Sequence, residues 1–173
     1  MNRRQFLYGT TAIAMPVLVS CGGDRFLISI DDSYPVGRYG ATSTAEEVTL
    51  GLDLTGKTAM VTGCNSGLGL ETMRVLALRG AHVIGTGRTL EKASKACSDV
   101  PGNTTPVALE LSSLQSVVEC ADSVARLGLP IDILVCNAGI NTFGELELVN
   151  GVERIFAVNY LGHFVLVNML LPL

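Results

Sequence analysis

A cluster of glycines between residues 63 and 69 follows an apolar stretch at 58–62 and precedes a helical pattern that ends near Gly80. A strand, a turn without side chains and a helix N-terminus direct backbone N–H groups and the positive end of a helix dipole to one point, which suits a pyrophosphate. A purely structural strand–helix turn would use similar glycines, so that alternative stays open. The loop residues that we expect to bind the ligand are Gly63, Asn65, Ser66, Gly67, Leu68 and Gly69.

Strands and helices alternate after this loop, which indicates an α/β fold with a parallel sheet and right-handed crossovers. The fourth strand is an apolar run interrupted only by Asp132, and this predicts burial on both of its faces. Ser112 and Gln115 have the spacing of a capping box at the start of the helix before it. The expected strands are 58–62, 81–86, 104–109 and 131–136, and the capped helix is 113–127.

Three motifs in this order resemble the short-chain dehydrogenase/reductase family. Thr62 and Gly63 begin a TGxxxGxG pattern, and residues 136–139 are close to the NNAG motif, with Cys136 in place of its first Asn. The sequence around Asn159, residues 156–164, is most similar to the retinol dehydrogenase and protochlorophyllide reductase branch. The resemblance covers residues 52–173 and implies a Rossmann-type, doubly wound parallel sheet in the order 3-2-1-4.

The resemblance also implies roles for particular residues. Asn137, Ala138 and Gly139 would border an NAD(P) cofactor at the end of the fourth strand. Asn159 would have a catalytic role, because the family holds a water of the proton relay at this position. The helix that carries Asn159 is expected to start near Gly151.

The end of the second strand favours NADP over NAD. A site that prefers NAD usually has an acidic residue there for the ribose 2′-hydroxyl, whereas this chain has Gly87 and Arg88. Arg88 can pair with a 2′-phosphate, although an ordinary solvated position at a helix start is the alternative. Glu110, at the end of the third strand, is expected near the adenine.

A proton donor for carbonyl chemistry is not found in the expected form. The family uses a Ser and a Tyr-x-x-x-Lys pair, but Tyr160 is followed by Phe164 four residues later. We therefore interpret the chain as the incomplete, cofactor-binding part of an NADP-dependent oxidoreductase that is inactive alone. The alternative is a stand-alone or vestigial nucleotide-binding module without catalysis. The expected substrate is a small carbonyl compound or alcohol, and the full-length form is expected to be a homo-oligomer.

Composition limits the other classes of function. The 173 residues carry a net charge of −4 with a pI of about 5.1, so no nucleic-acid partner is expected. His82 and His163 stand far apart among apolar residues, and no metal site is expected. The four cysteines after residue 60 are interpreted as small apolar residues rather than as a disulfide set.

The first 21 residues resemble an export signal. Arg3 and Arg4 begin a twin-arginine pattern, a short apolar segment follows at 7–20, and Cys21 ends a lipobox-like sequence. We expect Cys21 to be lipidated, so that the protein is anchored to the outer face of a bacterial membrane or in the periplasm, or is cytoplasmic if the signal is not functional. Residues 22–50 are expected to form a tether with a short helix near residue 44, and residues 51–173 the NAD(P)-binding domain.

Overall fold

The computed structural model describes residues 37–141 and 144–171. The predicted export signal at 1–21, including Cys21, lies outside these ranges, as does the tether as far as residue 36. The chain divides into two units, Met1–Gly40 and Ala41–Leu173, and the second contains all the helices and strands of the described residues.

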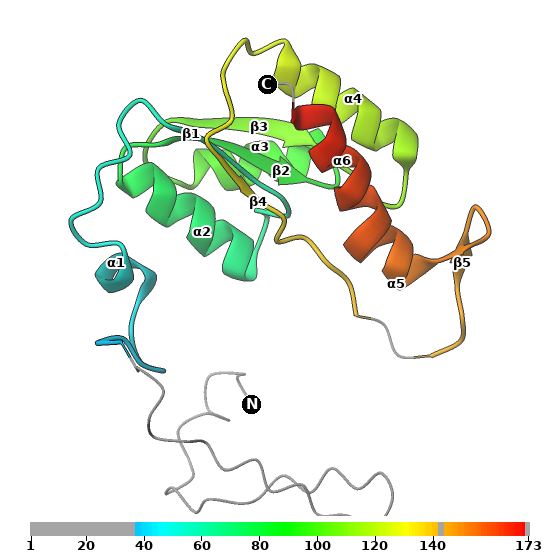
Figure 1. Cartoon of the computed structure of the whole chain (residues 1–173), viewed down its shortest axis with the longest axis horizontal. Coiled ribbons are helices and arrows are strands. Elements are labelled where there is room, and N and C mark those ends of the chain that lie inside the picture. The colour runs from blue at the N-terminus through cyan, green and yellow to red at the C-terminus, as the bar shows by residue number, and fades with distance from the viewer. Residues whose placement is uncertain (1–36, 142–143, 172–173) are drawn as a thin grey trace, which may run out of the picture. The chain divides into compact units, whose positions relative to one another are not determined.

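A four-stranded parallel sheet lies at the centre of this unit (Figure 1), in the order β3-β2-β1-β4. In this order β1 pairs with β2 from Thr58 opposite His82, and with β4 from Ala59 opposite Ile133. This is the expected Rossmann-type topology. The strands are β1 (Thr58–Val61), β2 (His82–Gly87), β3 (Thr104–Ala108) and β4 (Ile133–Val135).

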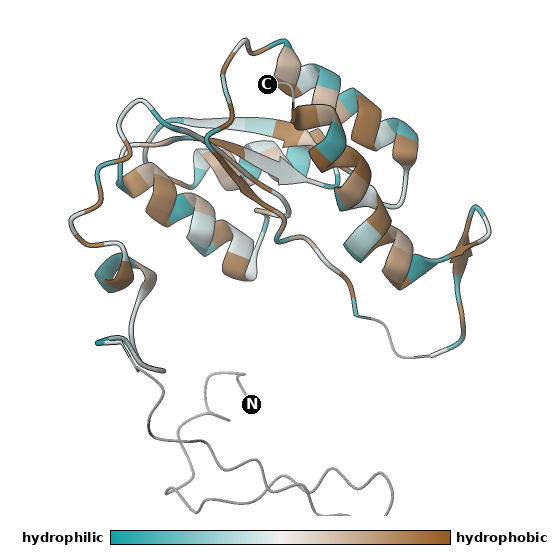
Figure 2. Ribbon diagram, in the orientation of Figure 1, coloured by the Kyte–Doolittle hydropathy of each residue, from teal (hydrophilic) through white to brown (hydrophobic). Residues whose placement is uncertain are grey.

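Helices cover both faces of the sheet because the strands alternate in the direction of their side chains. Ala59 and Val61 of β1 belong to one core cluster with Met73 of α2, whereas Met60 belongs to a second cluster with Leu166 of α6. Apolar residues (brown in Figure 2) alternate with polar ones along α4, as expected for a helix with one buried side, whereas α6 is apolar over most of its length. The longer helices are α2 (Gly67–Leu78), α3 (Leu90–Ser98), α4 (Leu114–Ala125) and α6 (Gly162–Leu170).

The predicted short helix is present as α1 (Ala45–Val48). Thr44 caps it, and a complete capping box joins Thr44 to Glu47 in both directions. An ion pair of 2.7 Å between Glu46 and Arg74 connects α1 to α2.

Two local predictions are wrong. Ser113, not Ser112, caps α4 by accepting a hydrogen bond from the Ser116 N–H, because Ser112 is bonded to the Glu110 carboxylate instead. The strand β4 is only half-buried, since it lies at the edge of the sheet in the described part of the chain.

The helix predicted from Gly151 starts later, after a small hairpin. Strands β5 (Leu148–Val149) and β6 (Val152–Glu153) pair antiparallel around a turn with positive φ at Asn150 and Gly151. The chain then continues through α5 (Arg154–Phe156), a π-helical turn η2 (Ala157–Leu161) and α6.

Most cysteines of the described residues are packed in the core. Cys64, Cys97 and Cys120 are buried and free, whereas Cys136 is exposed. Burial raises the pKa of the Cys64 and Cys120 thiols to about 12. Three of these cysteines therefore behave as the predicted small apolar residues, and Cys136 is the exception.

None of the helices in the described ranges combines the length and apolar character needed to cross a membrane.

Candidate nucleotide-binding site

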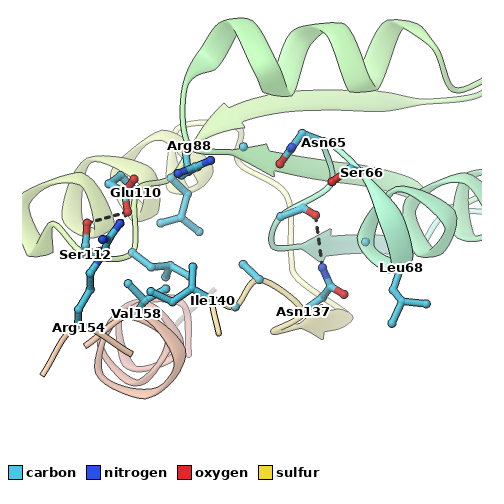
Figure 3. Close-up of a pocket in the computed structure, with 17 residues that line it drawn as sticks. Asn65, Ser66, Leu68, Arg88, Glu110, Ser112, Asn137, Ile140, Arg154 and Val158 are labelled. Atoms are coloured by element: carbon cyan, nitrogen blue, oxygen red, sulfur yellow. Dashed lines mark hydrogen bonds between the residues drawn. The ribbon is translucent and has the colours of Figure 1, made fainter. Parts of the chain in front are cut away.

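The loops that follow the four parallel strands meet at one edge of the sheet and enclose a cavity of about 440 Å³. This volume is in the range of small-molecule sites. The cavity lies at the carboxyl ends of the strands, where the strand order reverses between β1 and β4. Open α/β sheets bind ligands at this position. Figure 3 shows labelled side chains from five segments around the cavity. Its lining consists of Gly63, Asn65, Ser66, Leu68, Gly69, Gly87, Arg88, Leu109, Glu110, Leu111, Ser112, Asn137, Ala138, Gly139, Ile140, Arg154 and Val158.

Two glycines let the β1–α2 loop pack against the loop after β4. A Cβ at Gly63, where φ is +72°, would lie 2.9 Å from Ala138 Cβ. A Cβ at Gly69 would clash with the Gly63 carbonyl and with the Asn137 amide nitrogen. The Asn137 side chain can therefore donate to the Thr62 carbonyl oxygen at 2.8 Å. It can also donate to the Gly63 carbonyl oxygen at 3.4 Å (Figure 3). These glycines allow two loops to pack together, a role in addition to the pyrophosphate binding predicted from the sequence.

The N-terminus of α2 is not capped by a side chain. Thr89 and Ser113 each accept a hydrogen bond from the first turn of α3 and α4, but Ser66 accepts none from α2. Gly67, where φ is +61°, has open space on the side where a Cβ would point. Free N–H groups, a helix dipole and room beside the backbone are the requirements of a phosphate group.

Arg88 enters the cavity from the end of β2. A Cβ at Gly87 would lie 3.0 Å from the Ala93 backbone nitrogen, so glycine is needed where the strand passes into α3. The Arg88 side chain is exposed, and within the described ranges it has neither a hydrogen bond nor an ion pair. A guanidinium in this state is available to an anionic ligand.

The opposite end of the cavity combines Glu110 with Arg154. Ser112 donates its hydroxyl to the Glu110 carboxylate at 2.8 Å and its backbone N–H to the same oxygen at 3.0 Å, which fixes the carboxylate (Figure 3). Arg154 lies beside them and forms an ion pair with Glu147, just before the hairpin. Arg154 was not among the residues predicted to bind a ligand. Its position depends on the hairpin that precedes it, for which the Asn150–Gly151 pair is a strong sequence signal.

Asn159 lies behind the loop rather than in the cavity lining. Its amide accepts a hydrogen bond from the Ile140 N–H and donates one to the Ile140 carbonyl, both at 2.8 Å. It belongs to the π-helical turn η2, and such turns are frequent at functional sites. Its side chain is thus committed to holding the loop after Gly139.

The structure brings together ten of the residues predicted to bind a cofactor. Gly67 and Asn159 are adjacent to the cavity but do not line it, and Cys21 lies outside the described residues. Leu109, Leu111, Ile140 and Val158 line the cavity without having been predicted; they are ordinary apolar residues, and only the fold brings them there. No group of His, Cys, Asp and Glu in the described ranges could hold a metal ion.

The strand order and the cavity at the carboxyl ends of the strands define the class of the chain as a Rossmann-type nucleotide-binding domain. The family model described as short chain dehydrogenase matches residues 57–173. The chain belongs to the short-chain dehydrogenase family.

Related proteins agree with this assignment. The chain is 40% identical over 138 residues to the human WW domain-containing oxidoreductase, covering 77% of this chain and 33% of the relative. It is 42% identical over 121 residues to mouse retinol dehydrogenase 13, covering 67% of this chain and 36% of the relative. A metagenomic short-chain oxidoreductase in complex with NADP superimposes with a TM-score of 0.62 at 29% identity, over 69% of this chain and 57% of that structure. The chain thus spans about a third of the length of these two curated relatives.

Proposed function

We propose that the chain is the cofactor-binding part of an NADP-dependent oxidoreductase that transfers a hydride between its nicotinamide and a small carbonyl compound or alcohol. The single observation that carries the proposal is the pairing of an uncapped helix N-terminus with an unpaired arginine in one cavity. Gly67 leaves space beside the α2 N-terminus, and Arg88 has no partner in the described part of the chain. The NADP complex of a structural neighbour supports this choice of cofactor.

The residues present fit such a cofactor. The N–H groups at the start of α2 would hold the pyrophosphate, and the Arg88 guanidinium would hold the 2′-phosphate. Glu110, fixed by Ser112, would lie beside the adenine. When bound, the nicotinamide would supply the hydride that is exchanged with the substrate carbon.

The described cavity provides binding groups rather than a proton donor. Its titratable lining residues are Arg88, Glu110 and Arg154. The printed sequence contains no Tyr-x-x-x-Lys pair. We therefore propose that these 173 residues bind and orient the cofactor, while Asn159 holds the loop that borders it.

Replacing Arg88 tests the assignment. A hydrogen bond to a charged group contributes about 1.5–3 kcal/mol, so Arg88→Ala should weaken NADPH binding by roughly ten- to a hundredfold and leave NADH binding nearly unchanged. Arg126→Ala is the matched control, because Arg126 follows α4 and, among the described residues, its side chain bonds only to that of the nearby Ser123. Dissociation constants follow from NADPH and NADH fluorescence in a chain without tryptophan. Equal losses for both cofactors would contradict the proposal.

A further inference from the structure

A buried histidine connects three segments that surround the nucleotide site. His163, in the first turn of α6, is 6% exposed. Its Nε2 lies 2.9 Å from the hydroxyl of Thr62, and its Nδ1 lies 3.2 Å from the backbone carbonyl oxygen of Asn159. Thr62 directly follows β1, and its hydroxyl also accepts a hydrogen bond of 2.9 Å from the Ala138 N–H.

The partners of this network determine where each proton lies. The Asn159 carbonyl can only accept, so His163 Nδ1 must carry a proton. Burial lowers the pKa of His163, which favours the neutral ring. Nε2 is then an acceptor, and the Thr62 hydroxyl donates to it while accepting from Ala138. The alternative acceptor for Thr62, the Val135 carbonyl oxygen, is 3.5 Å away.

We propose that His163 is a positioning residue of the nucleotide site, which fixes the Thr62 hydroxyl and thereby holds the loop from Asn137 to Ile140 against the glycine loop. Asn159 holds the same loop from its other end, through Ile140. One hydrogen-bonded unit therefore joins the end of β1, the loop after β4 and the π-helical turn. The consequence for cofactor binding rests on the proposed function, whereas the network itself does not.

The tautomer of His163 can be tested directly. The chain contains two histidines, so ¹⁵N-histidine labelling gives two ring systems to assign. We expect His163 to be neutral, with a protonated Nδ1 and an unprotonated Nε2 at pH 7. A proton on Nε2 would overturn the proposal, because Thr62 could then no longer donate to it.

Two variants separate the hydrogen bond from the volume of the ring. The amide oxygen of His163→Gln reaches about as far as Nε2 and accepts a hydrogen bond, whereas His163→Leu fills space without an acceptor. His82→Gln is the matched control, since His82 Nε2 makes the same kind of contact with Thr105 Oγ1 at 2.7 Å at the opposite end of the strands. The readouts are the NADPH dissociation constant and the exchange rate of the Ala138 amide without cofactor.

We expect His163→Leu to weaken NADPH binding by about five- to thirtyfold, the factor for one lost buried hydrogen bond, and to speed Ala138 exchange. His163→Gln should restore both to within about threefold, and His82→Gln should match the wild type. Unchanged binding and exchange in His163→Leu, or equal defects in the Gln and Leu variants, would overturn the proposal. If the wild type binds no NADPH, the proposed function fails. The exchange rate of the Ala138 amide and the tautomer of the His163 ring then still test the positioning role of His163.

Discussion

The Gly69→Ala substitution sets helix propensity against packing. Gly69 lies in the first turn of α2, where Ala would normally stabilise the helix by up to about 1 kcal/mol. The new Cβ would clash with the Gly63 carbonyl oxygen and the Asn137 amide, and would stand 3.0 Å from the Gly63 carbonyl carbon. Overpacking against backbone costs about 1–3 kcal/mol, and the lost Asn137 hydrogen bond about 1 kcal/mol more. We therefore expect a net loss of roughly 1–3 kcal/mol in the free energy of unfolding.

Two other glycines provide the controls for this experiment. Gly67 and Gly128 have nearly equal φ values, +61° and +66°, and neither has an atom within 4 Å of an added Cβ. Each Ala variant should lose about 1 kcal/mol through backbone strain alone. Of these two control variants, Gly67→Ala should also weaken NADPH binding and Gly128→Ala should not, because Gly67 lies beside the cavity and Gly128 does not.

Urea unfolding and NADPH titration of the three variants provide the measurements. The reasoning is refuted if Gly69→Ala is as stable as the wild type, or loses no more than Gly128→Ala. Either result would mean that the loops around Asn137 can separate at little cost.

Three further predictions concern the cavity rim, the sheet and the N-terminus. Arg154→Ala should weaken NADPH binding several-fold, and Glu147→Ala by less, because Glu147 only orients Arg154; titration of both variants checks this order. The hydrogen bonds from Lys57 and the Thr58 N–H hold the pKa of Asp132 below its ordinary value. Asp132 therefore stabilises the folded state at pH values well above the ordinary Asp pKa of about 3.9, and this stabilisation is lost as the pH falls through the lowered pKa. Unfolding curves of the wild type and Asp132→Asn should converge in acid. We propose that Cys21 is lipidated, and fatty-acid labelling of the exported protein should disappear in Cys21→Ser.

The sheet could be predicted from the sequence because its signals are local. Apolar strands and amphipathic helices alternate along the chain, and these patterns predicted the strands and the glycine loop, whereas the strand order came from the family resemblance. The predicted strand ends lie within two residues of those observed, as at 131–136 against Ile133–Val135. The hairpin also had a local signal, Asn150–Gly151 between apolar residues, but the family pattern favoured a continuous helix there.

The contacts that complete the site could not be predicted in this way. Asn159 meets Ile140 across 19 residues, and His163 meets Thr62 across 101. No periodicity connects such pairs, and each depends on the packing of α6 against the sheet. Likewise, Ser112 satisfied a capping pattern but bonded to Glu110, because a nearby carboxylate competes with a helix N–H for the same hydroxyl.

If the chain is exported, as proposed for Cys21, its buried thiols make the timing of folding important. With pKa values near 12, Cys64 and Cys120 remain protonated and closed to oxidants in the native state. An unfolded chain would instead present them to an oxidising compartment, where mispaired disulfides would prevent β1 and α4 from reaching the core. The twin-arginine route carries folded proteins, so it would deliver these two cysteines already shielded. Cys136 would still reach the oxidising side as an accessible thiol, although partial burial raises its pKa.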